Sequence, residues 1–383
     1  MEILYDLSLL GFCKGDPSKI TGMPRVILEQ GTRLPAVPGL DLTFCATEDA
    51  EETYPVIRRH PAFAGARFAA WPPGSGEAGA DPFTSARVFH TPHSAIPDTV
   101  RGYGGLAVVQ TVYDMIPFLL PDTLTAEYQK YYADIVRRIR PEDHVITISE
   151  SAKADYCAYT GRDPARVHVI PLAADARTFQ PCRDAARLAA VREKYALPPG
   201  PYLLSVCTFE PRKNLPHVIR AFVALANQEH AADDLTLVLA GGRGWMFEPI
   251  LAELAGDDAL RARIVTTGYV DEADLAPLYS GALGFLYLSR YEGFGLPPLE
   301  AMQCGTPVVT SNTSSLPEVV GDAGVLLAPD DRDGLCQAML DLHRQPDLRA
   351  GFAERALRRA QLFSWDRNIR DTAAVYRLAA GER

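Results

Sequence analysis

Short apolar segments alternate with amphipathic segments along the whole chain. Six apolar segments in the first half and six in the second have the length and composition of strands that are buried on both faces. They cover residues 3–6, 42–46, 88–90, 106–113, 144–148, 167–170, 202–208, 235–240, 264–267, 284–288, 307–310 and 324–327. Because helical patterns separate them, the sequence predicts an α/β protein with two parallel sheets, and therefore two Rossmann-like domains.

The boundary between the two domains is predicted from the placement of prolines. Pro181, Pro198 and Pro199 surround one short charged helix, a composition typical of a linker. A chain of 383 residues is long enough to form two hydrophobic cores. The predicted parts are a first domain over residues 1–178, a linker over 179–200, a second domain over 201–362 and a C-terminal amphipathic helix within 363–383.

Composition excludes several classes of protein. The formal net charge of −10 argues against nucleic-acid binding, which needs a basic surface. The seven cysteines are scattered and form no CxxC pair, so neither a disulfide framework nor a zinc site is expected. The first residues include Glu2 and Asp6 where a signal peptide would be basic, and no apolar run approaches the roughly 20 residues of a membrane span. A cytoplasmic location is therefore expected.

The segment LGFLYLSRYEGFGLPPLEAMQCGTPVV carries the most specific chemistry. Its apolar start predicts a buried strand, and two prolines then open a helix. In the loop between them, Gly293 and Gly295 flank Phe294, so the backbone can approach a ligand closely. The N–H groups of Phe294, Gly295 and Leu296 are expected to point outward at the helix N-terminus, which favours an anionic or hydroxyl-rich ligand.

Two glutamates, Glu292 and Glu300, lie at the two ends of this loop and helix start. Glu300 alone could simply complement the helix dipole. That explanation does not cover Glu292, which precedes Gly-Phe-Gly in a loop that otherwise needs no charge. The pair resembles the paired-glutamate motif of the retaining glycosyltransferases of family 4. The resemblance implies the GT-B fold, in which two Rossmann-like domains face each other across a cleft and the last helix crosses back to the first domain.

A second motif, TFEPRKNL, follows the first strand of the second domain. Arg212 and Lys213 stand there at a helix start, where two cations could neutralise a diphosphate. Taken alone, such a pair is more often ordinary solvated surface. The motif is similar to the EPRKN segment of family 4, whose Arg and Lys bind the donor diphosphate, and the resemblance implies this role for Arg212 and Lys213.

Three further segments resemble parts of the family's donor site. LAGGRGWMFEPIL places Gly241 at a strand end, although a plain glycine turn explains it equally well. TGYVDEADLAPLYSGA places Tyr269 and Val270 where family members contact the nucleobase. KITGMPRVI offers Gly22 before a helix, where the family brings a glycine loop close to the donor phosphates.

The first domain departs from the family at one position. In TVYDMIPFLLPD the chain has Tyr113 and Asp114 where this branch of the family usually carries His-Asp. The family histidine lies near the donor sugar, so Tyr113 leaves the substrate contact open, while Asp114 matches a catalytic position. His90 or His93 of VFHTPHSAIP could fill the gap on the acceptor side, although a lone histidine at a strand end is more often a structural residue.

The expected chemistry needs neither a metal nor a cofactor. A nucleotide sugar already has a good leaving group, so the protein need only stabilise the departing diphosphate, which Arg212, Lys213 and helix N-termini can do. By acceptor geometry and by resemblance, Glu300 is expected at the ribose hydroxyls and Glu292 at the sugar hydroxyls. The acidic run Asp330, Asp331 and Asp333 is interpreted as a helix start and not as a metal site.

These observations predict a metal-independent hexosyltransferase. The resemblance to bacterial mannosyltransferases favours GDP-mannose as donor, a glycan or lipid-linked acceptor, surface polysaccharide biosynthesis and retention of anomeric configuration. Two alternatives remain open, a nucleotide-sugar epimerase of the same fold and a non-catalytic nucleotide-sugar-binding protein. Residues 123–140 combine tyrosines with Lys130, Arg137 and Arg138, which suggests peripheral contact with the inner face of the cell membrane. An ordinary amphipathic helix packed on the sheet is the alternative.

Overall fold

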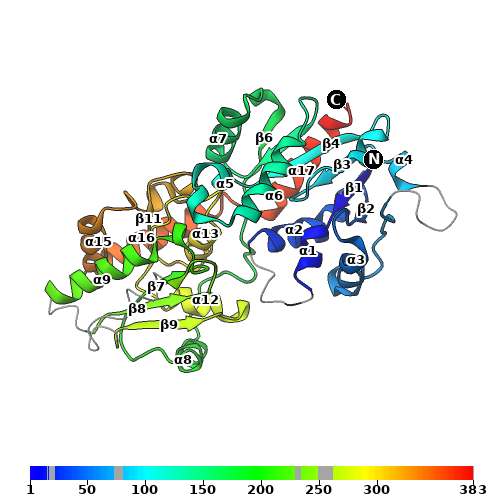
Figure 1. The fold of residues 1–383 in the computed structure, drawn as a ribbon. Helices are drawn as coiled ribbons and strands as arrows, with labels where there is room; N and C mark the ends of the chain where they lie inside the picture. Colours follow the sequence, from blue (N-terminus) through cyan, green and yellow to red (C-terminus); the bar gives the residue numbers. More distant parts are fainter. Residues whose placement is uncertain (15, 17–21, 73–80, 229–233, 249–261, 383) are drawn as a thin grey trace. The chain divides into compact units, whose positions relative to one another are not determined.

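The computed structural model describes residues 1–14, 16, 22–72, 81–228, 234–248 and 262–382. Its chain forms two compact units, each built around one six-stranded parallel sheet (Figure 1). The predicted α/β class with two parallel sheets is therefore confirmed. The first unit contains Met1–Pro121, Thr125–Leu172 and Trp365–Arg383, and the second contains Asp122–Leu124 and Ala173–Ser364.

All twelve predicted strands are present, with ends that differ from the predicted ones by no more than a few residues. The first sheet has the order β2-β1-β3-β4-β5-β6 and the second has the order β12-β11-β10-β7-β8-β9. The strands are β1 Glu2–Asp6, β2 Asp41–Cys45, β3 Val88–Thr91, β4 Ala107–Val112, β5 His144–Thr147, β6 Val167–Val169, β7 Tyr202–Val206, β8 Thr236–Ala240, β9 Ile264–Gly268, β10 Gly284–Tyr287, β11 Val308–Ser311 and β12 Gly324–Leu327.

Helices connect the successive parallel strands, as crossovers between parallel strands require, and the last three helices follow the final strand. None of the described helices is both long and apolar enough to cross a membrane. Those of the first unit are α1 Ser8–Phe12, α2 Met23–Arg33, α3 Ala50–Arg59, α4 Pro82–Ser85, α5 Ile116–Leu119, α6 Ala126–Arg137, α7 Glu150–Thr160 and α17 Trp365–Ala379. Those of the second unit are α8 Ala185–Lys194, α9 Leu215–Gln228, α12 Glu272–Ser280, α13 Leu296–Gln303, α14 Leu316–Val320, α15 Arg332–Arg344 and α16 Pro346–Ala360.

The last helix, α17, packs into the core of the first unit. Figure 1 shows it beside β4, and its apolar residues Ile369 and Tyr376 belong to the same buried cluster as Ile3 of β1. A buried hydrogen bond of 3.0 Å from Gln30 Nε2 to Asn368 Oδ1 joins it to α2. Burial of this apolar face, and not chain proximity, places the C-terminal segment in the first unit.

In the segment predicted as a linker, helix α8 packs against the second unit. Helix α8 lies on α12, where Lys194 Nζ is 2.6 Å from both Asp271 and Asp274, and Arg187 also pairs with Asp274. Asp274 is buried, so its charge requires these partners. Residues 179–200 lie within the compact second unit, and charged side chains of α8 take part in its packing.

Candidate functional site

The centre of the second sheet is a topological switch point. Strands β7 and β10 are neighbours, but the chain continues from β7 to β8 on one side and from β10 to β11 on the other. The loops that follow these two strands therefore diverge at the carboxyl edge of the sheet, which is where open α/β sheets bind ligands. The first loop carries Arg212 and Lys213, and the second carries Glu292.

The loop after β7 is fixed by its own backbone. Pro211 opens a short 3₁₀ turn, Pro211–Lys213, and Asn214 ends it in the left-handed conformation with φ of 58°. The Asn214 side-chain amide donates to the carbonyl oxygens of Leu288 (3.1 Å) and Pro329 (2.7 Å). These bonds tie the turn to the ends of β10 and β12, so the directions of Arg212 and Lys213 are determined before any ligand binds.

The cations of this loop pair with Glu292. Arg212 Nη1 donates to Glu292 Oε2 and Lys213 Nζ donates to Glu292 Oε1, both at 2.7 Å. Arg212 Nε also lies 2.7 Å from Glu210 Oε1. Tyr287 Oη completes the network, since it accepts from Lys213 Nζ at 2.6 Å and donates to Glu292 Oε1 at 2.9 Å. The structure thus brings together three of the predicted site residues.

Two members of this network were missed from the sequence. Glu210 is visible in the EPRKN motif, but its residue type alone gave it no role. Tyr287 lies in an otherwise apolar strand, so nothing in the sequence assigned a role to its hydroxyl. Lys213 is only 9% exposed, so it is not ordinary solvated surface. Each buried charge in this network is compensated by an opposite charge or a hydroxyl.

The electrostatics of the network keep Glu292 ionised. Burial would raise the pKa of Glu292, but Arg212 and then Lys213 outweigh burial and lower the pKa to about 2. Burial raises the pKa of Glu210, in spite of the same two cations. At neutral pH Glu292 is therefore a carboxylate whose two oxygens accept strong, charge-assisted hydrogen bonds.

The loop between Glu292 and α13 is held by two serines. Ser314 Oγ accepts from the Glu292 amide at 2.9 Å, and Ser315 Oγ contacts the carbonyl oxygens of Glu292 (2.9 Å) and Phe294 (2.5 Å). Gly295 has φ of +124°, a conformation that side chains disfavour. The Gly-Phe-Gly loop is therefore a preformed structure at the N-terminus of α13.

Glu300 lies in α13 and is only 3% exposed. Its Oε2 accepts a hydrogen bond of 3.0 Å from Tyr279 Oη of α12. An acidic side chain that only complements the helix dipole does not need to be buried. The burial of Glu300 therefore favours a ligand-binding role over a role in helix stability alone.

The remaining donor-side candidates have mixed environments. Gly241 has φ of +139°, and a side chain there would collide with the carbonyl oxygen of Cys207, so packing alone explains this glycine. Tyr269 is 44% exposed just after β9, and Val270 is buried. Gly22 stands at the N-cap of α2 with φ of 56°, while residues 19–21 of the same motif lie outside the described residues.

In the first unit the two histidines differ. His90 is fully buried, with Nδ1 2.6 Å from Tyr376 Oη and Nε2 2.8 Å from Thr111 Oγ1, and burial lowers its pKa to about 3. Both ring nitrogens are therefore used inside the core, which favours the structural alternative for His90. His93 lies instead among aromatic rings, 6.1 Å from the ring of Tyr113, and burial lowers its pKa to about 4.

Tyr113 and Asp114 follow β4 at the carboxyl edge of the first sheet. Asp114 Oδ1 accepts from the Ile116 amide at 2.9 Å, just before the short helix α5. Tyr113 is 3% exposed, and burial raises its pKa. The structure brings Tyr113 close to His93.

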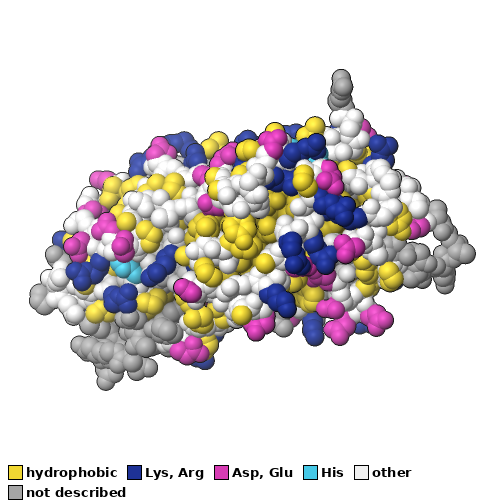
Figure 2. Space-filling view, turned by 45° about the horizontal axis from the view of Figure 1, so that its top comes forward, with side chains coloured by type: hydrophobic (Ala, Val, Ile, Leu, Met, Phe, Trp, Pro, Cys, Tyr) yellow, Lys and Arg dark blue, Asp and Glu magenta, His cyan; other side chains and the backbone are white. Residues whose placement is uncertain are grey.

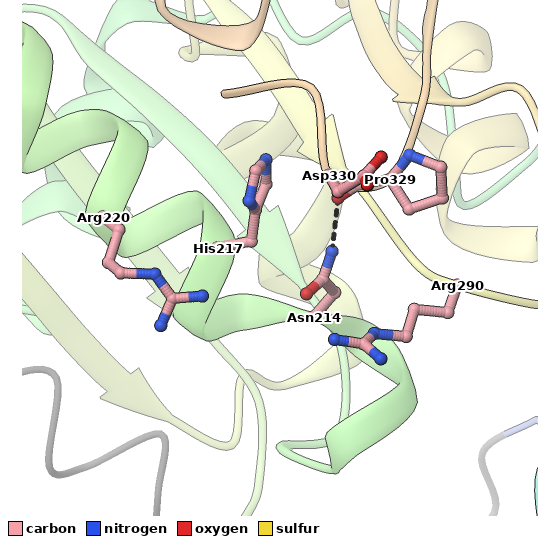
Figure 3. Close-up of a pocket in the computed structure, with 6 residues that line it drawn as sticks. All are labelled: Asn214, His217, Arg220, Arg290, Pro329 and Asp330. Carbon is pink, nitrogen blue, oxygen red and sulfur yellow. Dashed lines mark hydrogen bonds between the residues drawn. The ribbon is translucent and has the colours of Figure 1, made fainter. Parts of the chain in front are cut away.

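A cavity of about 380 Å³ lies next to the ion network of the second unit. In Figure 3 the guanidinium groups of Arg220 and Arg290 lie on either side of Asn214, whose bond to Pro329 is drawn as a dashed line. His217 and Asp330 line the cavity as well. Asp331, next in the acidic run, accepts from the Gly334 amide at 2.9 Å and caps α15, in agreement with a helix start.

Comparison with known proteins identifies the class. The family model described as Glycosyl transferases group 1 matches residues 190–359, and the one described as Glycosyltransferase Family 4 matches residues 20–177. Among solved structures, sucrose-phosphate synthase from Thermosynechococcus elongatus has a TM-score of 0.71 at 19% identity and covers 99% of this chain and 98% of its own. Anabaena HepE in complex with UDP-glucose has a TM-score of 0.70 at 16% identity, with 98% and 99% covered. The fold is that of the GT-B glycosyltransferases.

Curated relatives identify the family. O-antigen chain mannosyltransferase B from Escherichia coli is 32% identical over 292 residues, which are 76% of this chain and 74% of the relative. The serotype-specific mannosyltransferase WbdA from Escherichia coli is 29% identical over 255 residues, and the match spans 31% of that longer protein. The chain belongs to the glycosyltransferases of family 4.

The buried ion network leads to a prediction about stability. Replacing Arg212 and Lys213 together by alanine should lower the free energy of unfolding by about 3–5 kcal/mol, because the buried Glu292 carboxylate then loses both cations. Adding Glu292→Gln to this double variant should recover part of the loss, since the amide carries no charge. Urea unfolding of the three proteins measures the effect. A triple variant that is no more stable than the double variant would show that these ion pairs do not hold the loops.

Proposed function

We propose that the protein is a retaining hexosyltransferase that transfers mannose from GDP-mannose to a glycan or lipid-linked acceptor in surface polysaccharide biosynthesis. The names of its relatives support mannose as the transferred sugar and surface polysaccharide as the product, since both O-antigen chain mannosyltransferase B and the serotype-specific WbdA are named as mannosyltransferases. The nucleoside diphosphate is supported by structural relatives such as HepE, which was solved with UDP-glucose.

The observation that carries this proposal is the pair of cations fixed beside Glu292 at the switch point of the second sheet. Arg212 and Lys213 would bind the two phosphates and neutralise the charge that develops on the leaving diphosphate. Their geometry is set by Asn214 and by the network, so little reorganisation is needed when the donor binds. These fixed charges would supply the stabilisation that a divalent metal gives in other enzymes, so we propose a metal-independent reaction.

The two glutamates would divide the donor between them. Glu292 follows the strand next to the cations and would accept hydrogen bonds from the hydroxyls of the transferred sugar. Glu300, in the helix α13 that follows this loop, would accept hydrogen bonds from the ribose. Tyr279 holds the Glu300 carboxylate from one side through Oε2. In this arrangement one acid acts on the reacting group and the other on the part of the donor that does not react.

Donor binding and transfer test this function directly. GDP-mannose should raise the melting temperature more than UDP-glucose or ADP-glucose does, because a ligand that binds only the native state stabilises it in proportion to its affinity. Incubation of GDP-mannose with and without a lipid-linked acceptor fraction then separates the outcomes. Product that appears only with acceptor supports transfer, conversion of the donor without acceptor supports an epimerase, and binding without reaction supports a non-catalytic protein.

Single substitutions test the division of roles. Glu300→Ala should weaken GDP-mannose binding, whereas Glu292→Ala should mainly lower turnover. Each loses an acceptor for charge-assisted hydrogen bonds, which costs about 1.5–3 kcal/mol or roughly a 10- to 150-fold effect. Steady-state kinetics with varied donor measure both effects, and Glu354→Ala, on the exposed face of α16, is the control. Wild-type kinetics in both variants would contradict the assignment.

Peripheral membrane contact is the remaining part of the proposal. The aromatic half of the α6 pattern is only partly at its surface, since Tyr132 is buried and Tyr131, which donates to Glu48, is half-buried. The basic side chains of Arg137 and Arg140 are exposed. A cavity of about 290 Å³ is lined by Arg101, Arg137, Arg138 and Arg140. Figure 2 shows Lys and Arg side chains interspersed with Asp and Glu on the visible face of the first unit, so any attraction to anionic lipid must be weak.

Liposome flotation tests this contact. Association with vesicles that contain anionic lipid should be reversible and lost at high salt, with about 1 kcal/mol contributed by each basic residue at the surface. The variant Arg137→Glu with Arg140→Glu should abolish it, whereas Arg358→Glu, on α16 of the second unit, should not. Absence of salt-sensitive association in the wild type would leave α6 as an ordinary amphipathic helix.

A further inference from the structure

The ammonium group of Lys213 has two partners of different kinds. Its Nζ donates to Tyr287 Oη at 2.6 Å and to Glu292 Oε1 at 2.7 Å. The Glu210 carboxylate lies 4.0 Å from Nζ, which is too far for a hydrogen bond. Because an ammonium group carries three N–H donors, at least one N–H of Lys213 is not accepted by any described residue. That N–H is available to an oxygen of a ligand.

Tyr287 is the rigid partner of this ammonium. It ends β10, is 3% exposed, and has its ring stacked on that of Phe285 with 5.8 Å between the ring centroids. Its carbonyl oxygen accepts from Thr310 Oγ1 of the neighbouring strand at 2.7 Å. The sheet therefore sets the position of the Tyr287 hydroxyl. Lys213, in contrast, has a flexible four-carbon stem, so the place of its Nζ depends on the groups that hold it.

The roles of the Tyr287 hydroxyl are determined by its neighbours. An ammonium group cannot accept a hydrogen bond, so Tyr287 Oη accepts from Lys213 and donates its own hydrogen to Glu292 Oε1, at 2.9 Å. Burial, followed by the Glu292 carboxylate, raises the pKa of Tyr287 well above its ordinary value, so the hydroxyl keeps this hydrogen at neutral pH. A neutral group thus connects the cation with the carboxylate.

This connection becomes important when Glu292 takes a ligand. Its Oε2 is used by Arg212, and its Oε1 is shared by Lys213 and Tyr287. A sugar hydroxyl that donates to Oε1 competes with Lys213 for the same oxygen. The Tyr287 hydroxyl does not depend on that oxygen to accept from Lys213, so it still holds the ammonium when the direct ion pair with Glu292 is weakened.

We propose that Tyr287 is a positioning residue that holds the Lys213 ammonium in place for the donor diphosphate. The inference rests on the proposed function, because it takes Lys213 to bind phosphate and Glu292 to bind the sugar. Tyr287 acts through Lys213 and does not contact the donor itself. Without the hydroxyl, the Glu292 carboxylate would be the remaining partner of Lys213 and would draw the ammonium away from the phosphates.

The alternative is that the hydroxyl only compensates buried charge and therefore affects stability alone. Titration calorimetry of the full chain with GDP separates the two roles. Tyr287→Phe removes only the hydroxyl and should weaken GDP binding about tenfold. Tyr202→Phe is the matched control, since Tyr202 is buried in the neighbouring strand β7 and its hydroxyl donates to the Leu278 carbonyl oxygen at 2.7 Å. It should lower stability and leave GDP binding as in the wild type.

Dependence on Lys213 distinguishes positioning from a general loss of order. In a Lys213→Ala background, Tyr287→Phe should change GDP binding by less than about twofold, because no ammonium is left to hold. A purely structural role would weaken binding by the same factor in both backgrounds. Turnover of GDP-mannose gives a second readout. Tyr287→Phe should lower kcat about tenfold in the wild-type background, since Lys213 stabilises the charge that develops on the leaving diphosphate.

A second variant covers the case in which Tyr287→Phe melts below the temperature of the assay. 3-Fluorotyrosine at position 287 keeps the ring and the hydroxyl but makes the oxygen a poorer acceptor, and it should weaken GDP binding about threefold. GDP affinity as in the wild type for the variant that folds, or equal weakening with and without Lys213, would overturn the inference alone. Absence of GDP binding by the wild type would overturn the donor assignment and the inference with it.

Discussion

The pairing of the Glu292 carboxylate with Arg212 and Lys213 is the interaction on which the second unit's site depends. Charges removed from water must be compensated at short range, and here each oxygen of Glu292 has one cation at 2.7 Å. Because the carboxylate follows β10 and the cations follow β7, this requirement fixes two diverging loops relative to each other. The same constraint keeps the cations in place for an anionic ligand, so local stability and proposed chemistry have one physical origin.

The two sheets use the same topological feature for different chemistry. At the switch point of the second sheet the diverging loops present cations, which suit phosphate groups. At the switch point of the first sheet, between β1 and β3, the Asp6 carboxylate accepts a hydrogen bond from the Thr91 hydroxyl, which joins the two strand ends. This division follows from the side chains alone, since the backbone geometry of parallel strands is alike in both sheets.

Several residues that attract attention in the sequence serve the fold instead. Both ring nitrogens of His90 are used by Tyr376 and Thr111, and Gly241 is required because the Cys207 carbonyl oxygen leaves no room for a side chain. The charged helix α8 is held to α12 by the buried Asp274. In each case the residue type is compatible with a site or a linker, and only its neighbours decide. Burial converts a reactive or charged group into a structural one when its hydrogen-bonding capacity is filled.

The sequence by itself determined the twelve strands, the parallel class and the position of Glu292 and the EPRKN motif after strand ends, because periodicity and turn residues act over short distances. Only the tertiary structure decided that Tyr287 and Glu210 complete the network, that Lys213 is buried, and that Glu48 stands with Tyr131. The partners Lys213 and Glu292 are 79 residues apart in the chain, and Glu48 and Tyr131 are 83 apart. Such pairs are set by the order of strands in a sheet and by burial, which no local pattern records.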